Sequence, residues 1–184
     1  MSKKEEVVLL DEKNQPIGTA DKATVHTANT PYHRAFSCYV IDPTGNVLIT
    51  RRALHKATWP GVWTNSACGH PAFAEKDEAA IKRRLVHELG IQPTQISDIE
   101  CALPEFSYSA TDSSGIREWE FCPVYVVKVH NSSLLPNPEE VDSWDWVSPR
   151  DLLKAVTAVP AAFSPWMCEQ LAHSELRESL GLAS

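Results

Sequence analysis

The clearest helix pattern of the chain lies in residues 69–91, GHPAFAEKDEAAIKRRLVHELGI. Within this stretch the apolar residues Ile81, Leu85 and Leu89 recur every four positions, which places them on one face of a helix. A glycine follows Leu89 directly, and glycine is the residue that most often ends a helix. The pattern therefore predicts an amphipathic helix from Asp77 to Leu89.

Strand patterns flank this helix on both sides. Short apolar runs bounded by turn residues occur at residues 7–10, 17–20, 35–41 and 47–50 before it, and at 99–103, 119–129 and 143–147 after it. Two further helix patterns follow at residues 149–156 and 165–180. An all-parallel sheet would need more crossover helices than this order provides. We therefore expect an α/β or α+β fold, with a mixed β-sheet sandwiched by helices.

Length and charge limit the possible classes of protein. The 184 residues fit a single domain of ordinary size, so we expect one domain over residues 1–184. The chain has 17 basic and 24 acidic residues, a net charge of −7, and no basic stripe along one face. A nucleic-acid partner is therefore not expected, because such partners need a positively charged surface.

The sequence also bears on cellular location. Its longest nearly apolar stretch, Phe121–Val129, is interrupted by Pro123 and Lys128 and is far shorter than the roughly 20 residues of a membrane span. Residues Met1–Glu6 are charged and do not form a secretory signal. The five cysteines are scattered, which favours free thiols. We expect a cytoplasmic protein without a membrane partner, and the sequence leaves open whether it is a monomer or a homodimer.

A cysteine and a histidine stand close together in the segment TNSACGHP, residues 64–71. In an extended chain Cys68 and His70 would project to the same side, and Pro71 favours an extended backbone at His70. A thiol and an imidazole would then share one pocket wall. Taken alone, the same pair is also consistent with a buried cysteine beside a turn histidine.

The residues that follow fit the frame of the Nudix box, G-x5-E-x7-R-E-U-x-E-E-x-G-U, in which U is apolar. The matching positions are Gly69, Glu75, Arg83, Leu85, Glu88, Gly90 and Ile91. Arg84 and His87, however, stand where Nudix hydrolases carry glutamates that gather metal ions to activate water. An arginine beside Glu88 instead suits a site that holds a diphosphate while Mg²⁺ bridges it to Glu88. The alternative interpretation of Arg84 and Glu88 is an ordinary i,i+4 surface ion pair.

Four further motifs occur in the order expected of one known family. They are HTANTPYHRAFS with His26 and His33, TRRALHKATWPGVWTN with Arg51 and Arg52, FSYSATDSSGIREWEFCPV with Tyr108, and AFSPWM with Trp166. With TNSACGHP and the altered Nudix box, they make the chain resemble the type I isopentenyl diphosphate isomerases of the Nudix superfamily, from roughly Val7 to Glu178. The resemblance implies an isomerase of isoprene biosynthesis that interconverts isopentenyl and dimethylallyl diphosphate through a carbocation.

The resemblance also implies the roles of individual residues. The catalytic residues would be Cys68, Glu120, Tyr108 and Trp166. The basic residues that bind the diphosphate of the small-molecule substrate would be Lys22, Arg52, Lys56 and Arg84. Two metal sites are implied: Mg²⁺ held with the diphosphate by Glu88, and a second ion, Mn²⁺, Mg²⁺ or Zn²⁺, held by His26, His33, His70, Glu118 and Glu120. The four remaining histidines match no ligand position: His55, His87, His130 and His173.

The chemistry of these residue types agrees with the implied roles. Glu118 and Glu120 alternate with Trp119 and Phe121, so in a strand the carboxylates share one face while the aromatic rings face a core. Protonating an alkene requires an acid, a base on the opposite side and exclusion of water. The π face of Trp166 could stabilise the resulting cation by about 2 kcal/mol when desolvated.

Two other functions remain open from the sequence. The first is a Nudix hydrolase of a nucleoside or prenyl diphosphate, which the residues Arg84 and His87 disfavour. The second is a non-catalytic binding protein with a Nudix fold, in which Cys68 and the histidines would be structural. The second function leaves the paired catalytic and metal positions unexplained.

Overall fold

The computed structural model describes residues 5–182 and contains two β-sheets with five α-helices. The outermost residues of the expected 1–184 domain, including Met1–Lys4 of the charged amino terminus, lie outside the described residues. The smaller sheet has the strand order β2 (Pro16–Asp21), β1 (Glu6–Leu10), β3 (His33–Arg34), β10 (Arg117–Phe121) and β9 (Ser107–Thr111). The larger has the order β12 (Val141–Val147), β5 (Val47–Arg52), β4 (Phe36–Ile41), β11 (Val124–Val129) and β8 (Ile96–Leu103), with β6 (Trp63–Thr64) on β5 and β7 (Ala67–Gly69) on β4. Both sheets contain parallel and antiparallel pairs, which confirms the mixed-sheet prediction.

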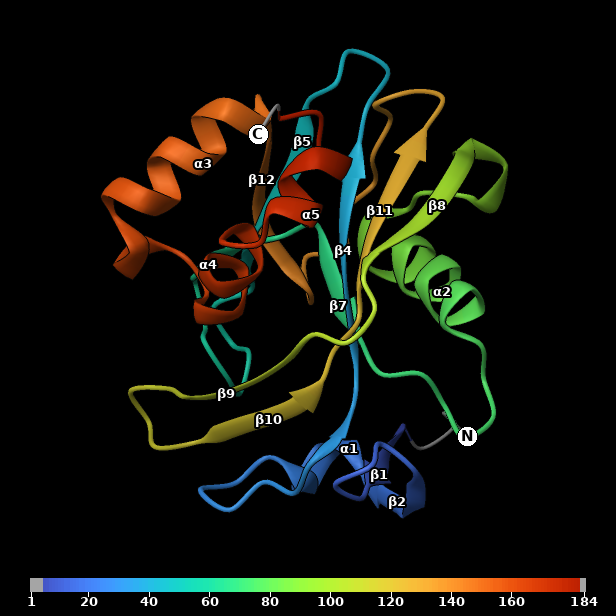
Figure 1. Cartoon of the computed structure of the whole chain (residues 1–184), viewed down its shortest axis with the longest axis vertical. Coiled ribbons are helices and arrows are strands. Elements are labelled where there is room, and N and C mark those ends of the chain that lie inside the picture. The colour runs from blue at the N-terminus through green and yellow to red at the C-terminus, as the bar shows by residue number, and fades with distance from the viewer. Residues whose placement is uncertain (1–4, 183–184) are drawn as a thin grey trace.

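Helices cover both faces of the larger sheet (Figure 1). These helices are α2 (Asp77–Leu89) on one face and α3 (Pro149–Ala158), α4 (Pro165–Leu171) and α5 (Ser174–Ser179) on the other. The short helix α1 (Lys22–Val25) contacts β1 and β2 of the smaller sheet instead, and 3₁₀ turns lie at Pro93–Gln95 and Pro160–Ala162. Along β4, Phe36 and Val40 belong to the core cluster of α2, whereas Tyr39 belongs to the cluster of α3, α4 and α5. This alternation follows from the two-residue period of a strand, and it buries the sheet between two helical layers.

Helix α2 has the bounds that the sequence predicts. Its apolar stripe Ile81, Leu85 and Leu89 is fully buried. Gly90 ends it in the left-handed conformation, with φ 69°, and the N–H of Ile91 donates to the carbonyl of Leu85. The N–H of Gly90 also donates to the carbonyl of Val86, as in the αL type of glycine cap, so carbonyls that the last turn would otherwise leave unpaired are satisfied.

Replacing Gly90 by alanine should therefore destabilise the fold by about 1–3 kcal/mol, because a side chain is strained at this φ. A Cβ at this position would also lie 2.7 Å from the Cβ of Leu135 and 2.9 Å from its carbonyl oxygen. Gly115→Ala is the matched control, because Gly115 has φ +86° and nothing within 4 Å of its Cβ position. Urea unfolding should show a larger loss for Gly90→Ala, and equal losses would mean that the Leu135 contact is unimportant.

Two predicted elements are divided in the structure. The expected strand 119–129 is β10 followed by β11, because the chain passes from the smaller to the larger sheet at Cys122 and Pro123. Proline has no N–H for a sheet ladder, so it suits this crossing. The expected helix 165–180 is α4 followed by α5, with Ala172 and His173 between them. The short elements β9 and α1 were not predicted.

The crossing at Cys122 and Pro123 has a counterpart at Ala35, where the chain passes from β3 to β4. Strands β3 and β10 are parallel partners in the smaller sheet, and β4 and β11 are parallel partners in the larger one. Two neighbouring segments therefore change sheets side by side, as Figure 1 shows between its upper and lower halves. The candidate site lies at this junction.

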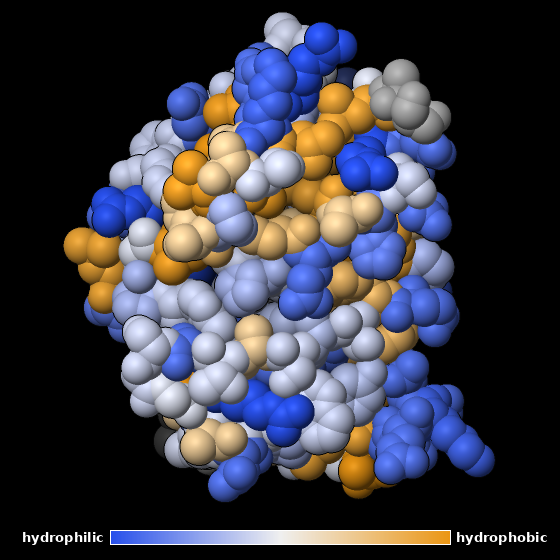
Figure 2. Space-filling model, turned by 60° about the vertical axis from the view of Figure 1, so that its left-hand side comes forward, coloured by the Kyte–Doolittle hydropathy of each residue, from blue (hydrophilic) through white to orange (hydrophobic). Residues whose placement is uncertain are grey.

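On the side seen in Figure 2, apolar residues gather in the upper half, with hydrophilic residues among and above them. Large exposed apolar side chains include Ile17, Leu54, Phe73 and Leu135. None of the helices in residues 5–182 combines the length and the apolar character that crossing a bilayer requires.

Candidate active site and metal centre

A cavity of about 200 Å³ opens at the junction of the two sheets. Its walls contain all the predicted site residues except His33: Lys22, His26, Arg52, Lys56, Cys68, His70, Arg84, Glu88, Tyr108, Glu118, Glu120 and Trp166. These residues come from seven different elements and the loops beside them, so the fold gathers positions that are distant in sequence. The predicted site residues therefore surround one cavity, with His33 in contact with Glu120 beside it.

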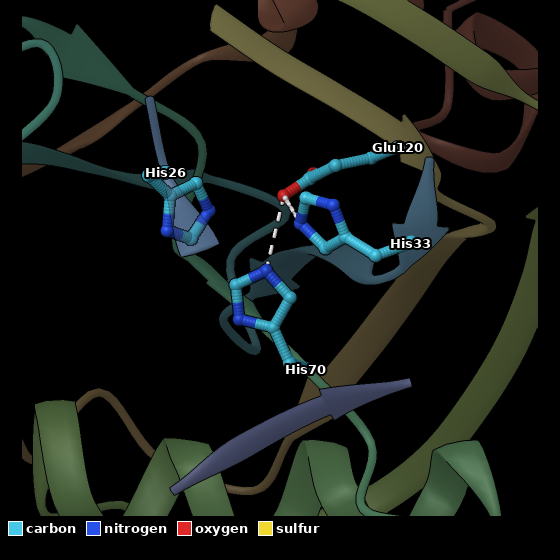
Figure 3. A group of neighbouring side chains, drawn as sticks. All are labelled: His26, His33, His70 and Glu120. Carbon is cyan, nitrogen blue, oxygen red and sulfur yellow. Dashed lines mark hydrogen bonds and ion pairs between the residues drawn. The ribbon is translucent and has the colours of Figure 1, made fainter. Parts of the chain in front are cut away.

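Three histidines and one glutamate converge at one end of this cavity (Figure 3). One ligand atom from each of His26, His33, His70 and Glu120 lies within 4.8 Å of the others. The register between β3 and β10 brings His33 directly opposite Glu120, while His26 follows α1 and His70 follows β7. Glu120 Oε1 lies 3.2 Å from His33 Nε2 and 3.0 Å from His70 Nε2.

The hydrogen bonds outside this cluster favour metal binding. His33 Nδ1 lies 2.8 Å from the carbonyl of Pro31, to which it can only donate, so Nε2 is left to face the cluster. His70 Nδ1 is buried and has no hydrogen-bond partner within residues 5–182, although its ring lies in a polar cluster. Imidazole nitrogens with a carboxylate oxygen suit a divalent transition-metal ion. The residues present therefore fit such an ion.

Protonation in the cluster is uneven. Burial lowers the pKa of His26, with His33 adding to the effect, and burial lowers the pKa of His70 to about 4. Burial opposes protonation of His33 too, but the hydrogen bond and charge of Glu120 outweigh it and raise the pKa of His33. Burial alone would raise the pKa of Glu120, yet His33 and His70 hold it well below its usual range. At least two rings are thus neutral near pH 7, which is the form that binds metal.

Glu118 lines the cavity but does not belong to the four-residue cluster. Its carboxylate accepts hydrogen bonds from Thr58 Oγ1 and from the Tyr108 hydroxyl, both at 2.7 Å. Burial and the charge of Glu120 raise the pKa of Glu118. A ligand role for Glu118 stays a prediction, and Thr58 is a site residue that the sequence did not reveal.

Tyr108 lies between the two carboxylates. Its hydroxyl is also 2.9 Å from Glu120 Oε2, which agrees with the expected hydrogen bond near Glu120. Burial, with the charges of Glu118 and Glu120, raises the pKa of Tyr108 far above its ordinary value, so the phenol keeps its proton.

The prediction that the aromatic neighbours of these carboxylates face a core is wrong for Trp119. Its side chain is 39% exposed, lies 5.2 Å from the ring of Tyr32 and is covered by the guanidinium of Arg117 at 4.4 Å. This side chain of the strand therefore stacks on a cation at the surface instead of entering a core.

The Cys68 thiol faces the cavity from β7. Its sulfur lies 3.3 Å from Asn65 Nδ2 and 3.4 Å from Ser37 Oγ. Burial raises the pKa of Cys68 to about 11, so the group is a thiol near neutral pH. Neither Asn65 nor Ser37 was identified from the sequence as a site residue.

Trp166 closes the cavity from α4, and only 2% of it is exposed. The indole lies 5.7 Å from the Tyr108 ring and 5.3 Å edge-on from Trp59, and the Arg52 guanidinium lies 5.6 Å above it. Arg52 itself donates to the carbonyls of Thr58 and Trp59. The aromatic rings of Trp166 and Tyr108 thus form an apolar part of the cavity wall.

The basic end of the cavity is balanced by carboxylates. Arg84, which is 4% exposed, donates to Glu88 through Nε at 2.8 Å and through Nη2. The interpretation of this pair as a surface ion pair is wrong, because both side chains are buried. Lys56 pairs with Glu140, which also lies 3.5 Å from Arg84, and Lys22 pairs with Glu5 at 2.5 Å. Glu140 has no sequence motif that would have identified it.

Two neighbouring arginines, Arg51 and Arg83, do not line the cavity. Arg51 donates to the carbonyl of Gly61 and pairs with Asp142. Arg83, within α2, forms two hydrogen bonds with Glu75 and so ties the helix to the segment that precedes it.

Comparison with known proteins agrees with this geometry. A family model described as the NUDIX domain matches residues 31–167. The chain is 57% identical over 180 residues to the isopentenyl-diphosphate Delta-isomerase of Corynebacterium diphtheriae, covering 98% of each protein. It is 53% identical over 177 residues to the protein of the same name from Kocuria rhizophila, covering 96% of each.

The fold is similar to solved Nudix-type structures at lower identity. The structure of DR0079 from Deinococcus radiodurans matches with a TM-score of 0.71 and 20% identity, over 91% of this chain and 98% of that one. A MutT protein from Methanosarcina mazei matches with a TM-score of 0.58 and 18% identity, over 81% of this chain and 96% of that one. These two likenesses concern the fold alone.

Proposed function

The chain belongs to the Nudix family and, within it, to the isopentenyl-diphosphate Delta-isomerases, and we propose that it interconverts isopentenyl and dimethylallyl diphosphate with Cys68 and Glu120 as the catalytic pair. One observation carries the assignment of the pair. A protonated thiol and an ionised carboxylate line the same small, largely enclosed cavity. Such a pair can give a proton to one carbon and take one from another.

The reaction adds a proton to the terminal CH₂ carbon of the alkene and forms a tertiary cation at the neighbouring carbon. A proton then leaves the CH₂ group on the other side of that carbon, so the double bond moves and no atom is lost. Cys68 and Glu120 are the proposed donor and acceptor of these protons. The indole of Trp166 and the phenol of Tyr108 line the same cavity, where a π face and a buried hydroxyl can stabilise the cation and hold Glu120.

Binding of the substrate is assigned to the basic end of the cavity. Lys22, Lys56 and Arg84 lie on its wall with Arg52, and each can donate to phosphate oxygens. Three of these cations pair with carboxylates: Lys22 with Glu5, Lys56 with Glu140 and Arg84 with Glu88. A diphosphate would therefore exchange places with carboxylates that already satisfy the cations.

Divalent metal ions are the proposed cofactors. The cluster of His26, His33, His70 and Glu120 would hold one ion, Mn²⁺, Mg²⁺ or Zn²⁺, and Glu88 would hold Mg²⁺ with the diphosphate. When bound, these ions supply positive charge that offsets the carboxylates and the diphosphate. Glu118 is proposed as an additional ligand, because each of its oxygens accepts one hydrogen bond, from Thr58 and from Tyr108, and keeps a lone pair that could bind an ion.

A single assay tests the reaction class. Isopentenyl diphosphate is incubated with the protein and Mg²⁺, and dimethylallyl diphosphate and released phosphate are measured together. We expect the isomer without stoichiometric phosphate. Phosphate or diphosphate release would favour a hydrolase instead. Glu88 is the one terminal glutamate that the Nudix helix keeps, and it is paired with the buried Arg84. This arrangement leaves little capacity to gather metal ions for water activation.

His26→Ala and Glu88→Gln should separate the two proposed metal sites. His26→Ala removes one of four clustered ligands and should reduce metal content without substrate. Glu88→Gln should leave that content unchanged and weaken only the Mg²⁺ bound with a substrate analogue. Metal analysis of both variants, with and without the analogue, checks this, and the same losses in both variants would indicate one site.

We also propose a cytoplasmic location, supported by the five cysteines, all of which are free within residues 5–182. Thiols that stay reduced are typical of that compartment. Cell fractionation with an antibody to the protein tests the location.

A further inference from the structure

Asn65 lies in the short connection between β6 and β7, and its exposed fraction is 0%. Its side-chain amide touches two of the proposed catalytic residues at once. Oδ1 accepts a hydrogen bond from Trp166 Nε1 at 2.9 Å, and Nδ2 donates toward Cys68 Sγ at 3.3 Å. These two partners come from α4 and β7, two elements that are far apart in the sequence.

The orientation of the amide is fixed by its partners. An indole N–H can only donate, so the atom that faces Trp166 must be the oxygen. Thr64 Oγ1 donates to the same oxygen at 2.8 Å. The nitrogen end then faces the carbonyls of Ala67 at 2.9 Å and Cys38 at 3.1 Å, as well as the sulfur. The two N–H groups of the amide are thus shared among these two carbonyls and the sulfur, and the Cys68 thiol can in turn donate to Oδ1 at 3.5 Å, so both ends of the amide contact Cys68.

The same segment also fixes the start of α4. Because Thr64 donates to Asn65, the contact of 2.8 Å between Thr64 Oγ1 and Ser164 Oγ has Ser164 as its donor. Ser164 immediately precedes α4, the helix that carries Trp166. The indole is therefore held through its own N–H and through the residue that directly precedes its helix.

We propose that Asn65 is a positioning residue that fixes the Trp166 indole and the Cys68 thiol relative to each other on the wall of the cavity. The inference rests on the proposed function, in which the thiol exchanges a proton with the alkene and the indole faces the cation. A planar amide joins the two groups through atoms that cannot move independently. Misplacement by about 1 Å can cost about 100-fold in rate, so this coupling bears on catalysis rather than on diphosphate binding.

Ser66 provides the matched control for a purely structural role. It is also 0% exposed, donates to the carbonyl of Leu48 at 2.6 Å and accepts from the N–H of Val40 at 2.7 Å. None of these partners lines the cavity. Ser66→Ala therefore removes buried hydrogen bonds from the same connection without touching Cys68 or Trp166.

The experiment measures kcat, KM and the urea midpoint for wild type, Asn65→Ser, Asn65→Leu and Ser66→Ala with isopentenyl diphosphate. We expect the Asn65 variants to lose about 10–100-fold in kcat with KM within about threefold, because the basic residues are not disturbed. Ser66→Ala should lower the urea midpoint comparably and keep kcat. Asn65 variants whose kcat matches that of Ser66→Ala, or whose loss is in KM alone, would overturn the positioning role.

Trp166→Phe supplies a second readout, because phenylalanine keeps an aromatic face and has no N–H. Asn65→Ser should cost clearly less in kcat in the Trp166→Phe background than in wild type, since part of its action has already been removed. An equal loss of kcat from Asn65→Ser in both backgrounds would contradict the coupling. If neither Asn65 variant folds, Thr64→Val removes the hydroxyl that anchors Asn65, and an unchanged kcat there would also overturn the proposal. A wild-type protein without isomerase activity would instead refute the proposed function itself.

Discussion

Cys68→Ala and Glu120→Gln should each lower kcat for isomerisation by about 10²–10⁴-fold, the usual contribution of one positioned acid or base. Each substitution removes one group of the proposed proton transfer, whereas Lys22, Lys56 and Arg84 remain to bind the diphosphate. Binding of isopentenyl diphosphate, measured by calorimetry, should therefore persist in Cys68→Ala. Turnover like that of wild type in either variant would remove that residue from the mechanism.

Cys122→Ala is the control for loss of a buried thiol. Its sulfur lies 3.3 Å from the same Ser37 hydroxyl that contacts Cys68, but it does not line the cavity. Burial raises the pKa of both cysteines, so the two thiols share their protonation state and differ in access to the substrate. A large kcat loss in Cys122→Ala would mean that packing near Ser37 is responsible. Metal analysis is needed for Glu120→Gln, because Glu120 also belongs to the metal cluster.

The parts of the fold that could be predicted are those determined by residues close together in the sequence. Helix α2 has the expected bounds because its apolar period and its glycine cap act within one segment. The turn between β4 and β5 likewise comes from neighbouring residues, with Asp42 accepting from the backbone of Thr44 and Asn46. Such features are present in the sequence before any tertiary contact forms.

The parts that were missed depend on contacts distant in sequence. The division of residues 119–129 between two sheets follows from parallel pairing with β3 and β4, which the apolar pattern alone cannot show. Trp119 was expected in a core because strand alternation says which side a residue faces, but not what covers that side. Asn65 acts through Trp166, 101 positions away, so no local spacing marks it.

The candidate site was predicted in a different way. Its residues were identified from the motifs that resemble the isomerases, and the structure brings nearly all of them to one cavity. Their partners Thr58, Ser37 and Glu140 were absent from the prediction, because threonine, serine and glutamate are common surface residues. Only their distances to Glu118, Cys68 and Lys56 give them a role.

Arg84→Gln should raise KM for isopentenyl diphosphate by about 10–100-fold, the effect of losing about 1.5–3 kcal/mol of charged hydrogen bonding. The guanidinium also compensates Glu88 and Glu140, and removing one partner of a buried ion pair costs about 3–5 kcal/mol of stability. Gln is preferable to Glu, which would add a further carboxylate to this cluster. Kinetics are therefore measured well below the thermal midpoint of the variant, which a melting curve supplies.

Arg83→Gln is the neighbouring control on the same helix. Arg83 pairs with Glu75 at the surface, where an exposed ion pair contributes about 1 kcal/mol or less. It should leave KM nearly unchanged and lower the melting temperature only slightly. An Arg84→Gln protein with the KM of wild type would mean that Arg84 serves only to neutralise Glu88 and Glu140.

Magnesium binding distinguishes these two roles further. Arg84 donates to Glu88, the carboxylate expected to bind Mg²⁺ with the diphosphate. Arg84→Gln frees this carboxylate and removes a positive charge, so it should strengthen Mg²⁺ binding without substrate while it weakens diphosphate binding. Opposite shifts of the two affinities, measured by calorimetry, would indicate that the diphosphate and Glu88 compete for Arg84. A loss of both affinities would instead indicate a collapsed site. It would contradict the idea that Glu88 leaves Arg84 to bind Mg²⁺ when the diphosphate binds.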